Sequence, residues 1–401
     1  MPDPEPNTEA RTRRVSELWG HQAAARADGD WLKSVAWAEH SLTARHINKM
    51  VSGDPSVDWI DWAAHGFLED RGGVGLSLGC GTGYVERHVI ERRLASRMEG
   101  IDISADAVAG ARRAAGHMPI SYRCEDLNSL VLEEGAYDFV LSAAALHHVT
   151  DLEGCLCQVR RSLKPGGVLI MHEYVGPVRF QWTGAQLGIA NRVYAALPDR
   201  YRANHLTGLA HDAIMRRPLG DMIKADPSEA VRSNEIIGIA ESLFEPVSSR
   251  PIGGALLHPL LEGIIGNFKE GEPLDDTMLK MIIDLDAQAL RTGELDSDFV
   301  VWVGRKTGLE HPETEELMRA GKEKQDVIAR QEEEILALNG RLEAANEQAL
   351  TLAASNESLS SEIVGLKRER ESMASELEAL KSTKPFKTAR YIRVKVRRKR
   401  T

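Results

Sequence analysis

The feature that constrains this chain most is an alternation of short apolar runs and amphipathic stretches between residues 73 and 304. Such alternation is typical of βαβ units, which build a largely parallel sheet covered by helices. We therefore predict an α/β fold. Strands are expected at 74–79, 97–102, 119–124, 137–143, 167–173, 245–251 and 298–304, and helices at about 82–93, 104–115, 151–163, 255–268 and 276–292.

Further helical segments accompany the predicted sheet. Residues 11–70 carry apolar residues near helical spacing and predict an N-terminal helical cap, interrupted by the turn Ser52-Gly53-Asp54-Pro55. Residues 177–244 also look mainly helical and predict an insertion within a domain at 71–308. The segment 1–10 is rich in Pro, Asp, Glu and Asn, so we expect it to be disordered.

A heptad pattern begins at Ile335 and continues for seven repeats. The a positions are Ile335, Leu342, Ala349, Asn356, Ile363, Arg370 and Leu377, and the d positions are Leu338, Ala345, Leu352, Leu359, Leu366, Met373 and Leu380. Apolar residues at every d position and most a positions predict a coiled coil over 315–383, and with it a homodimer. A polar Asn at an a position fixes the register of a two-stranded coil. The alternative is a long, solvated single helix.

The last segment, 384–401, contains nine Lys or Arg and no acid, although the whole chain has a formal net charge of −10. A basic tail that also carries apolar residues predicts peripheral contact with an anionic membrane surface. Non-specific binding of nucleic acid and a disordered solubilising tail are the alternatives. The acidic balance of the chain and its 5% aromatic content argue against nucleic acid as the main partner.

The four cysteines, Cys80, Cys124, Cys155 and Cys157, follow no secretory signal. We therefore expect free thiols in a cytoplasmic protein, peripheral at most to the inner surface of the membrane. Cys155 and Cys157 lie two residues apart in a predicted helix and do not share a face. Because no second Cys or His pair has metal-ligand spacing, the sequence predicts no metal site.

A glycine-rich segment, Leu76-Ser77-Leu78-Gly79-Cys80-Gly81-Thr82-Gly83, ends the first predicted strand and precedes an amphipathic helix. Glycines at such a turn allow positive φ angles and let a ligand approach the backbone closely. The amides at the start of the following helix then point toward the carboxylate of the ligand. The segment therefore predicts a loop that binds a ligand.

Carboxylates end the next two predicted strands. Asp102 follows the glycine loop by about twenty residues and is placed to accept hydrogen bonds from a ribose diol. Asp126 ends the third strand and is placed to accept from an adenine amino group. Each residue alone would also suit a helix cap or a turn. Together they fall at the ends of three successive strands, where open α/β sheets bind ligands.

These segments resemble those of class I S-adenosylmethionine-dependent methyltransferases. The resemblance covers about residues 70–180 and rests on Gly79-Cys80-Gly81-Thr82-Gly83, Gly100-Ile101-Asp102-Ile103-Ser104, Tyr137 to Ser142, Leu146-His147-His148 and Leu163 to Gly167. It implies a Rossmann-like seven-stranded sheet and S-adenosyl-L-methionine as cofactor. The cofactor-binding residues that it implies are Gly79, Cys80, Gly81, Gly83, Asp102, Ile103, Asp126, Leu127 and Ser142.

The chain departs from the family pattern at Ser77, where the family usually has an acid. The departure implies a weaker cofactor site or another polar contact. A nicotinamide-dependent oxidoreductase is an alternative, but it requires G-x-G-x-x-G, and the third glycine here comes one residue earlier. A second alternative is a catalytically degenerate scaffold that acts through its coiled coil.

The expected reaction is transfer of a methyl group to a small-molecule or glycan acceptor, at a hydroxyl. The expectation of a glycan comes from a narrower resemblance, to bacterial methyltransferases of polysaccharide or lipopolysaccharide assembly. This resemblance rests on Glu173 to Pro177, Phe180 to Trp182, Gly253 to His258 and Ser52 to Pro55. His147 and His148, after the fourth strand, and Glu173, in the fifth, are the catalytic candidates. We expect His40, His46, Phe180, Trp182 and His258 to be core or surface residues unless they reach the acceptor pocket.

Overall fold

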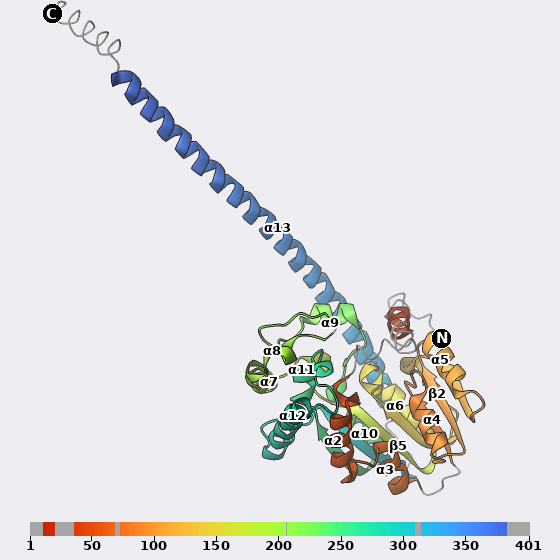
Figure 1. Ribbon diagram of the computed structural model, residues 1–401. Coiled ribbons are helices and arrows are strands. Elements are labelled where there is room, and N and C mark those ends of the chain that lie inside the picture. The colour runs from red at the N-terminus through yellow and green to blue at the C-terminus, as the bar shows by residue number, and fades with distance from the viewer. Residues whose placement is uncertain (1–10, 21–35, 69–72, 206, 309–313, 383–401) are drawn as a thin grey trace, which may run out of the picture. The chain divides into compact units, whose positions relative to one another are not determined.

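The computed structural model describes residues 11–20, 36–68, 73–205, 207–308 and 314–382. Within these ranges seven strands form one sheet in the order β3-β2-β1-β4-β5-β7-β6. Figure 1 labels β2 and β5 of this sheet and several of the helices around it. The strands are β1 (Val74–Leu78), β2 (Arg97–Asp102), β3 (Ile120–Cys124), β4 (Tyr137–Ala143), β5 (Leu163–Tyr174), β6 (Glu245–Gly253) and β7 (Phe299–Arg305). The first five are parallel, and β7 pairs antiparallel with both β5 and β6. The predicted α/β class and Rossmann-like seven-stranded sheet are confirmed.

The strand order reverses at β1, which pairs with β2 on one side and with β4 on the other. Leu78, the last residue of β1, lies opposite Ile101 of β2 and Ser142 of β4. The carboxyl ends of these strands therefore meet at one edge of the sheet. In open α/β sheets, the crevice at such a reversal is where ligands bind.

Helices cover both faces of the sheet. Successive side chains of a strand point to opposite faces, so each face presents apolar side chains that a helix can bury. In β4, Phe139 packs in one hydrophobic cluster and its neighbour Val140 in another. The first cluster includes residues of α2 (Ser41–Ser52), α3 (Trp59–Phe67), α4 (Tyr84–Glu91) and α12 (Pro273–Thr292). The second includes α6 (Leu152–Ser162) and α10 (Ile236–Leu243), while α5 (Ala105–Ala115) packs in a third cluster beside β3. Burial on both faces explains the apolar runs of the central strands β4, β5 and β7, whereas the edge strand β6 is mostly exposed.

The N-terminal cap is helical in its described parts. A helix spans residues 11–20, and η2 (Trp37–Glu39), α2 and α3 follow. The predicted turn is confirmed: Gly53 ends α2 in the left-handed conformation, with φ 86°. The part of the predicted helical cap at 21–35 lies outside the described residues, as do the predicted disorder at 1–10 and the basic tail at 384–401.

The prediction for 177–244 was right in part. It contains η5 (Val178–Phe180), α7 (Gly184–Ala196), α8 (Asp199–Arg202), α9 (Leu219–Ala225), η6 (Ser233–Glu235) and α10. The described residues between α8 and α9, however, are not helical. The helix predicted at 255–268 was wrong as a single element, because Gly263 adopts a φ of +73° between α11 (Leu257–Leu261) and η7 (Ile265–Asn267).

The chain divides into two compact units, residues 1–335 and 336–401. The first contains the sheet, its helices and the beginning of α13 (Thr314–Ser382). The described part of the second unit is the continuation of α13. The predicted long C-terminal helix is thus confirmed as a helix.

No helix among the described residues is both long and apolar enough to cross a membrane.

Candidate functional site

The glycine loop is built as the sequence predicts. Gly79, Gly81 and Gly83 have φ angles of 61°, 52° and 79°, in the region that favours glycine. A Cβ on Gly83 would overlap the hydroxyl of Tyr122, and one on Gly79 would overlap Ala145. A Cβ on Gly81, by contrast, would meet nothing, because this residue borders open space in the cavity described below. Two of the glycines are therefore required by packing, and Gly81 leaves room for a ligand.

Asp102 closes the loop from the neighbouring strand. Its Oδ2 accepts a hydrogen bond from the amide of Gly81 at 2.8 Å, and its Oδ1 accepts from the amide of Ser104, also at 2.8 Å. Burial raises the pKa of this carboxyl, while the two amide hydrogen bonds oppose the rise. Each oxygen keeps a second lone pair, so the carboxylate can organise the loop and also accept from a ligand hydroxyl.

Asp126 lies at the same cavity and connects it to the N-terminal helix at 11–20. Its Oδ1 accepts from the backbone amide and the side-chain amide of Asn128, at 2.9 and 2.8 Å. Its Oδ2 accepts from the Thr12 hydroxyl at 3.0 Å. Ser16 donates to the carbonyl of Ile103 at 3.0 Å, one turn further along the helix. The N-terminal helix is therefore fastened over the ends of β2 and β3, as the predicted cap requires.

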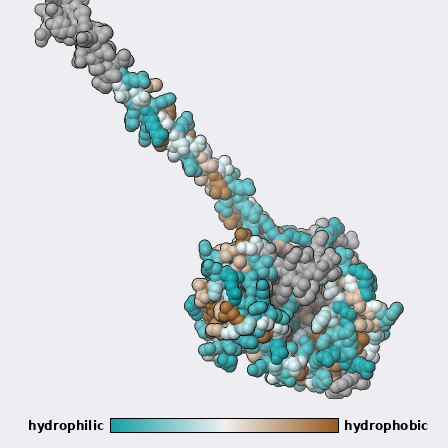
Figure 2. All heavy atoms as spheres, in the orientation of Figure 1, coloured by the Kyte–Doolittle hydropathy of each residue, from teal (hydrophilic) through white to brown (hydrophobic). Residues whose placement is uncertain are grey.

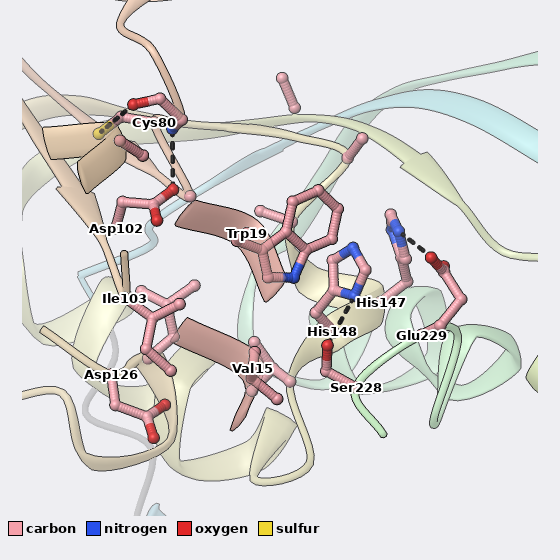
Figure 3. Close-up of a pocket in the computed structure, with 18 of the residues that line it drawn as sticks. Val15, Trp19, Cys80, Asp102, Ile103, Asp126, His147, His148, Ser228 and Glu229 are labelled. Atoms are coloured by element: carbon pink, nitrogen blue, oxygen red, sulfur yellow. Dashed lines mark hydrogen bonds and ion pairs between the residues drawn. The ribbon is translucent and has the colours of Figure 1, made fainter. Parts of the chain in front are cut away.

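One cavity of about 480 Å³ joins these groups. This volume is in the usual range of about 300–1,000 Å³ for small-molecule sites. In Figure 3, Asp102, Ile103 and Asp126 lie on one side of the cavity, His147, His148 and Glu229 on the other, and Val15 and Trp19 of the N-terminal helix between them. We call the first side the donor end and the second the acceptor end.

Glu173 is the buried centre of the acceptor end. Its Oε1 accepts from the Ser142 hydroxyl at 2.6 Å and from the amides of Ala145 and Leu146 at 2.9 and 3.0 Å. Its Oε2 lies 2.9 Å from Nδ1 of His147, in η4 (Leu146–His148). Burial alone would raise the pKa of Glu173, but these donors hold it below its usual value. Because both of its oxygens accept hydrogen bonds, the Glu173 carboxylate is a fixed anion, and it orients His147.

His147 takes its orientation from this anion. Burial by itself would lower the pKa of the imidazole, but the hydrogen bond and the charge of Glu173 raise it above its usual value. With Nδ1 donating to Glu173, the other nitrogen, Nε2, lies 3.5 Å from Oε1 of Glu229. His147 is therefore held between two carboxylates.

His148 is held by a second set of contacts. Its Nδ1 lies 3.2 Å from the hydroxyl of Ser228, which in turn donates to Oδ1 of Asp226 at 2.6 Å. Its ring also packs edge-on against Trp19, with centroids 4.9 Å apart. Burial lowers the pKa of His148 well below its usual value, so the ring is neutral near pH 7.

The turn that carries Ser228 and Glu229 is anchored by Arg179. The Arg179 guanidinium donates to the carbonyls of Asp226, Pro227 and Glu229 and forms an ion pair with Glu332 of α13, within the first unit. Arg179 itself has a φ of 56°, in the left-handed region. Such a strained residue is kept only where its surroundings determine its conformation, as the buried contacts do here.

Aromatic rings complete the wall of the acceptor end. Tyr174, Phe180, His258 and Phe299 all border the cavity and contact one another in edge-to-face geometry. Burial lowers the pKa of His258 to about 3, so this ring is neutral and behaves as part of the apolar wall. Trp182 stacks behind Phe180. The wall suits a ligand that presents apolar surface beside a polar group.

The structure brings most of the sequence-predicted residues to this cavity. Its lining includes Gly79, Cys80, Gly81, Asp102, Ile103, Asp126, Leu127, His147 and His148. Gly83, Ser142 and Glu173 lie behind it: Gly83 begins α4, and Ser142 and Glu173 bond to each other. Of the three histidines considered for the acceptor pocket, His258 borders the cavity, whereas His40 caps α2 and His46 faces Asp286 and Asp284.

Sequence reasoning missed Glu229, Ser228 and Trp19. Glu229 and Ser228 lie in the helical insertion, far along the chain from the strand ends and without a motif of their own. The tertiary fold alone brings them to His147 and His148. Trp19 fell within the predicted cap, but helical spacing does not show which ring covers a site. All four cysteines are free, as predicted.

Comparison with known proteins finds similarity in the part of the chain that carries the glycine loop, Asp102 and Asp126. The family model described as a methyltransferase domain matches residues 76–171, from β1 into β5. A ubiquinone biosynthesis O-methyltransferase of Bradyrhizobium sp. (strain ORS 278) is 33% identical over 121 residues, which are 30% of this chain and 45% of that protein. A malonyl-[acyl-carrier protein] O-methyltransferase of Bacillus cytotoxicus is 28% identical over 99 residues, 25% of this chain and 34% of that protein. The chain thus spans less than half the length of these relatives.

Among solved structures, an S-adenosylmethionine dependent methyltransferase from Mesorhizobium loti aligns with a TM-score of 0.37 and 19% identity. The alignment covers 61% of this chain and 97% of that one.

The residues at the donor end fit S-adenosylmethionine. The open space at Gly81 would receive the methionine part beside the loop amides, and Asp102 and Asp126 supply acceptors for a ribose and an adenine amino group. Ser77 borders the cavity where the resemblance implies an acid, so this position offers a hydroxyl in place of a carboxylate. The matched segment and these residues agree: residues 76–171 match a model described as a methyltransferase domain, and the residues at the donor end fit S-adenosylmethionine as cofactor.

Proposed function

We propose that this protein is an S-adenosylmethionine-dependent methyltransferase that methylates a hydroxyl of a small-molecule or glycan acceptor. The observation that carries the proposal is the single cavity that joins the glycine loop and Asp102 to the oriented His147. The names of two relatives, both O-methyltransferases, favour oxygen as the methylated atom. The glycan alternative rests on the resemblance carried by Glu173 to Pro177, Phe180 to Trp182 and Gly253 to His258.

The bound cofactor supplies an activated methyl group on a sulfonium, which leaves as a neutral thioether. The main task of the protein is therefore to hold donor and acceptor in line and to exclude water. The glycine loop, Asp102 and Asp126 position the donor. Val15 and Trp19 of the N-terminal helix cover the cavity between its two ends.

At the acceptor end, His147 is placed to receive the hydroxyl proton. Because Glu173 holds the proton on Nδ1, the lone pair of Nε2 is available to the acceptor. Glu173 acts as a positioning residue, since it is buried behind His147 and does not border the cavity. Glu229 lies 3.5 Å from the same nitrogen and the ring of His148 lies beside that of His147, so both would shape the place where the hydroxyl binds.

We further propose that the protein is a dimer through α13. In the second unit, Leu338, Leu342, Leu352, Leu359, Ile363, Leu366 and Met373 are each more than half exposed in the single chain. Hydrophobic residues recur among hydrophilic ones along this helix (Figure 2). Pairing of two copies would bury these a and d side chains. The basic tail at 384–401 would then bring two cationic segments to an anionic membrane, which adds avidity.

Two measurements test the proposed function. Isothermal titration of the purified protein with S-adenosylhomocysteine is expected to show one site per chain. Transfer of a radiolabelled methyl group is then measured with panels of hydroxylated small molecules and glycans as acceptors. Absence of nucleotide binding would contradict the proposal, whereas binding without transfer to any acceptor would favour the scaffold alternative.

A further inference from the structure

Three potential metal ligands converge at the acceptor end, although the sequence predicts no metal site. His147 and His148 come from η4, and Glu229 comes from the turn before η6, some eighty residues later. One ligand atom from each residue lies within 4.8 Å of the others. Figure 3 shows the three side chains grouped on one wall of the cavity. The cluster therefore has an open side.

The hydrogen bonds around His147 leave the correct nitrogen for a metal. Nδ1 donates to Glu173, a buried carboxylate whose other oxygen is held by Ser142 and two amides. Nε2 then carries a lone pair on the cavity side. A carboxylate behind a histidine is the arrangement that fixes the tautomer and orientation of metal-binding imidazoles.

His148 has the same arrangement with different partners. The single hydroxyl proton of Ser228 goes to Asp226, at 2.6 Å, so Ser228 can only accept from Nδ1 of His148. The lone pair of His148 is therefore also on Nε2. The tautomers of the two adjacent histidines are thus fixed by different partners. A chance cluster of polar side chains would not need this arrangement.

Glu229 supplies the third ligand atom. Its Oε1 is buried and has no hydrogen-bond partner among the described residues. It lies 3.5 Å from Nε2 of His147, long for a hydrogen bond. Two tetrahedral ligands, each about 2.0–2.1 Å from a zinc ion, are separated by roughly 3.4 Å. The observed spacing suits two ligands of one ion, and Arg179 fixes the turn that presents Glu229.

We propose that His147, His148 and Glu229 bind one divalent transition-metal ion, with at least one coordination position open to the cavity. Two imidazoles and one carboxylate suit ions such as Zn²⁺, Co²⁺ or Fe²⁺. Mg²⁺ prefers oxygen ligands and is not expected to bind here. Three protein ligands with an open position are typical of catalytic rather than structural sites.

The site also bears on the proposed reaction, and this step alone rests on the proposed function. A metal ion at Nε2 of His147 would occupy the lone pair that otherwise receives the hydroxyl proton, so with the ion bound this proton would pass to solvent. An acceptor hydroxyl bound at the open position would be made more acidic, as a metal lowers the pKa of bound water. The metal would thus favour the ionised form of the acceptor hydroxyl, as the proposed reaction requires.

The test is the binding of Co²⁺ to the full chain after treatment with a chelator, followed by calorimetry and by the visible absorption of the bound ion. The wild type is expected to bind one Co²⁺ per chain, and Zn²⁺ is expected to displace it. Glu229→Gln keeps the shape of the side chain, and His148→Phe keeps a ring against Trp19. Both variants are expected to weaken binding by more than about 100-fold, and Ser228→Ala by about 10-fold, as for the loss of an outer partner.

His65→Gln is the matched control, because His65 is an exposed histidine of α3 and is expected to leave binding unchanged. Thermal unfolding of each variant shows that it is folded. The proposal is overturned if the wild type binds no Co²⁺, or if Glu229→Gln binds it as tightly as the wild type. Because no methyl donor is present, either result leaves the proposed methyl transfer to be judged by its own experiment.

Discussion

Nδ1 of His147 lies 2.9 Å from Oε2 of Glu173, and the opposite oxygen of Glu173 accepts from the Ser142 hydroxyl and two backbone amides. Oxygen and nitrogen atoms from the ends of β4 and β5 and from η4 thus meet in one buried network. The network fixes the face that His147 presents to the cavity.

Glu173→Gln is expected to disturb the orientation of His147 without changing the binding of the cofactor. The amide cannot accept from all its present donors, so His147 loses its fixed tautomer. We expect kcat for methyl transfer to fall by about 100-fold, the scale of a proton-transfer contribution, with little change in affinity for S-adenosylhomocysteine. Unfolding should also require about 1–3 kcal/mol less. Glu241→Gln, an exposed position of α10, serves as control; equal kcat in both variants would contradict the role of Glu173.

Removal of residues 1–20 tests the N-terminal helix as a cover of the cavity. The truncated protein loses the hydrogen bonds of Thr12 to Asp126 and of Ser16 to Ile103. We expect its affinity for S-adenosylhomocysteine to fall about tenfold, as for the loss of one or two hydrogen bonds. Arg13→Ala, on the exposed side of the helix, should bind normally. An unchanged dissociation constant in the truncated protein would show that the helix is not part of the site.

Glu86 should make stability depend on pH. This residue of α4 is fully buried, and burial raises its pKa from 4.5 to about 7. Because the folded-state pKa is raised, its contribution to stability is complete below pH 4.5 and is lost as the pH rises through 7. From pH 5.5 to 8.5, the free energy of unfolding should therefore fall less in Glu86→Gln than in the wild type. The difference should be at most roughly 2 kcal/mol, because part of the contribution is already lost between pH 4.5 and 5.5.

Urea unfolding at the two pH values measures this difference. Glu91→Gln is the matched control, since Glu91 lies in the same helix but is exposed. If the free energy of unfolding had the same pH dependence in the wild type and in Glu86→Gln, ionisation of Glu86 would not destabilise the folded state, and the prediction would be wrong.

Leu359→Asp tests the coiled coil. Leu359 is at a d position and is 53% exposed in the single chain, so pairing would bury it. Light scattering after size exclusion should give the mass of two chains for the wild type and of one chain for the variant. Ser361→Asp, on the outer face of the same heptad, should remain dimeric. A wild type that is monomeric at micromolar concentration would contradict the pairing.

The sequence predicted the donor end better than the acceptor end, for a physical reason. Asp102 and Asp126 follow strands whose apolar runs can be read directly, and parallel strands bring their ends to one edge. Glu229 reaches His147 only because the insertion folds back over the sheet, and no local pattern records that path. Ser142 shows a related limit of sequence reasoning. It lies near the carboxyl end of β4, at the edge of the sheet that carries the site, but its hydroxyl donates to the buried Glu173 and does not reach the cavity.

Element boundaries were least predictable where a single backbone angle decides them. The apolar spacing at 255–268 continues through Gly263, yet the left-handed conformation of this glycine ends the helix. A Cβ there would overlap the side chain of Asn204, a contact between distant parts of the chain. Such a contact is invisible to helical periodicity. The heptads of α13, in contrast, are local and long, and the helix was predicted nearly to its ends.

The central claim is that the ends of β1, β2 and β3 bind S-adenosylmethionine, and calorimetry of Asp102→Ala with S-adenosylhomocysteine tests it most directly. The carboxylate holds the Gly81 amide and faces the donor end, so its loss should weaken binding by at least about 30-fold, as for hydrogen bonds to a charged group. Asp284→Ala, exposed on α12, should bind as the wild type does. Equal affinity in Asp102→Ala and the wild type would contradict the account.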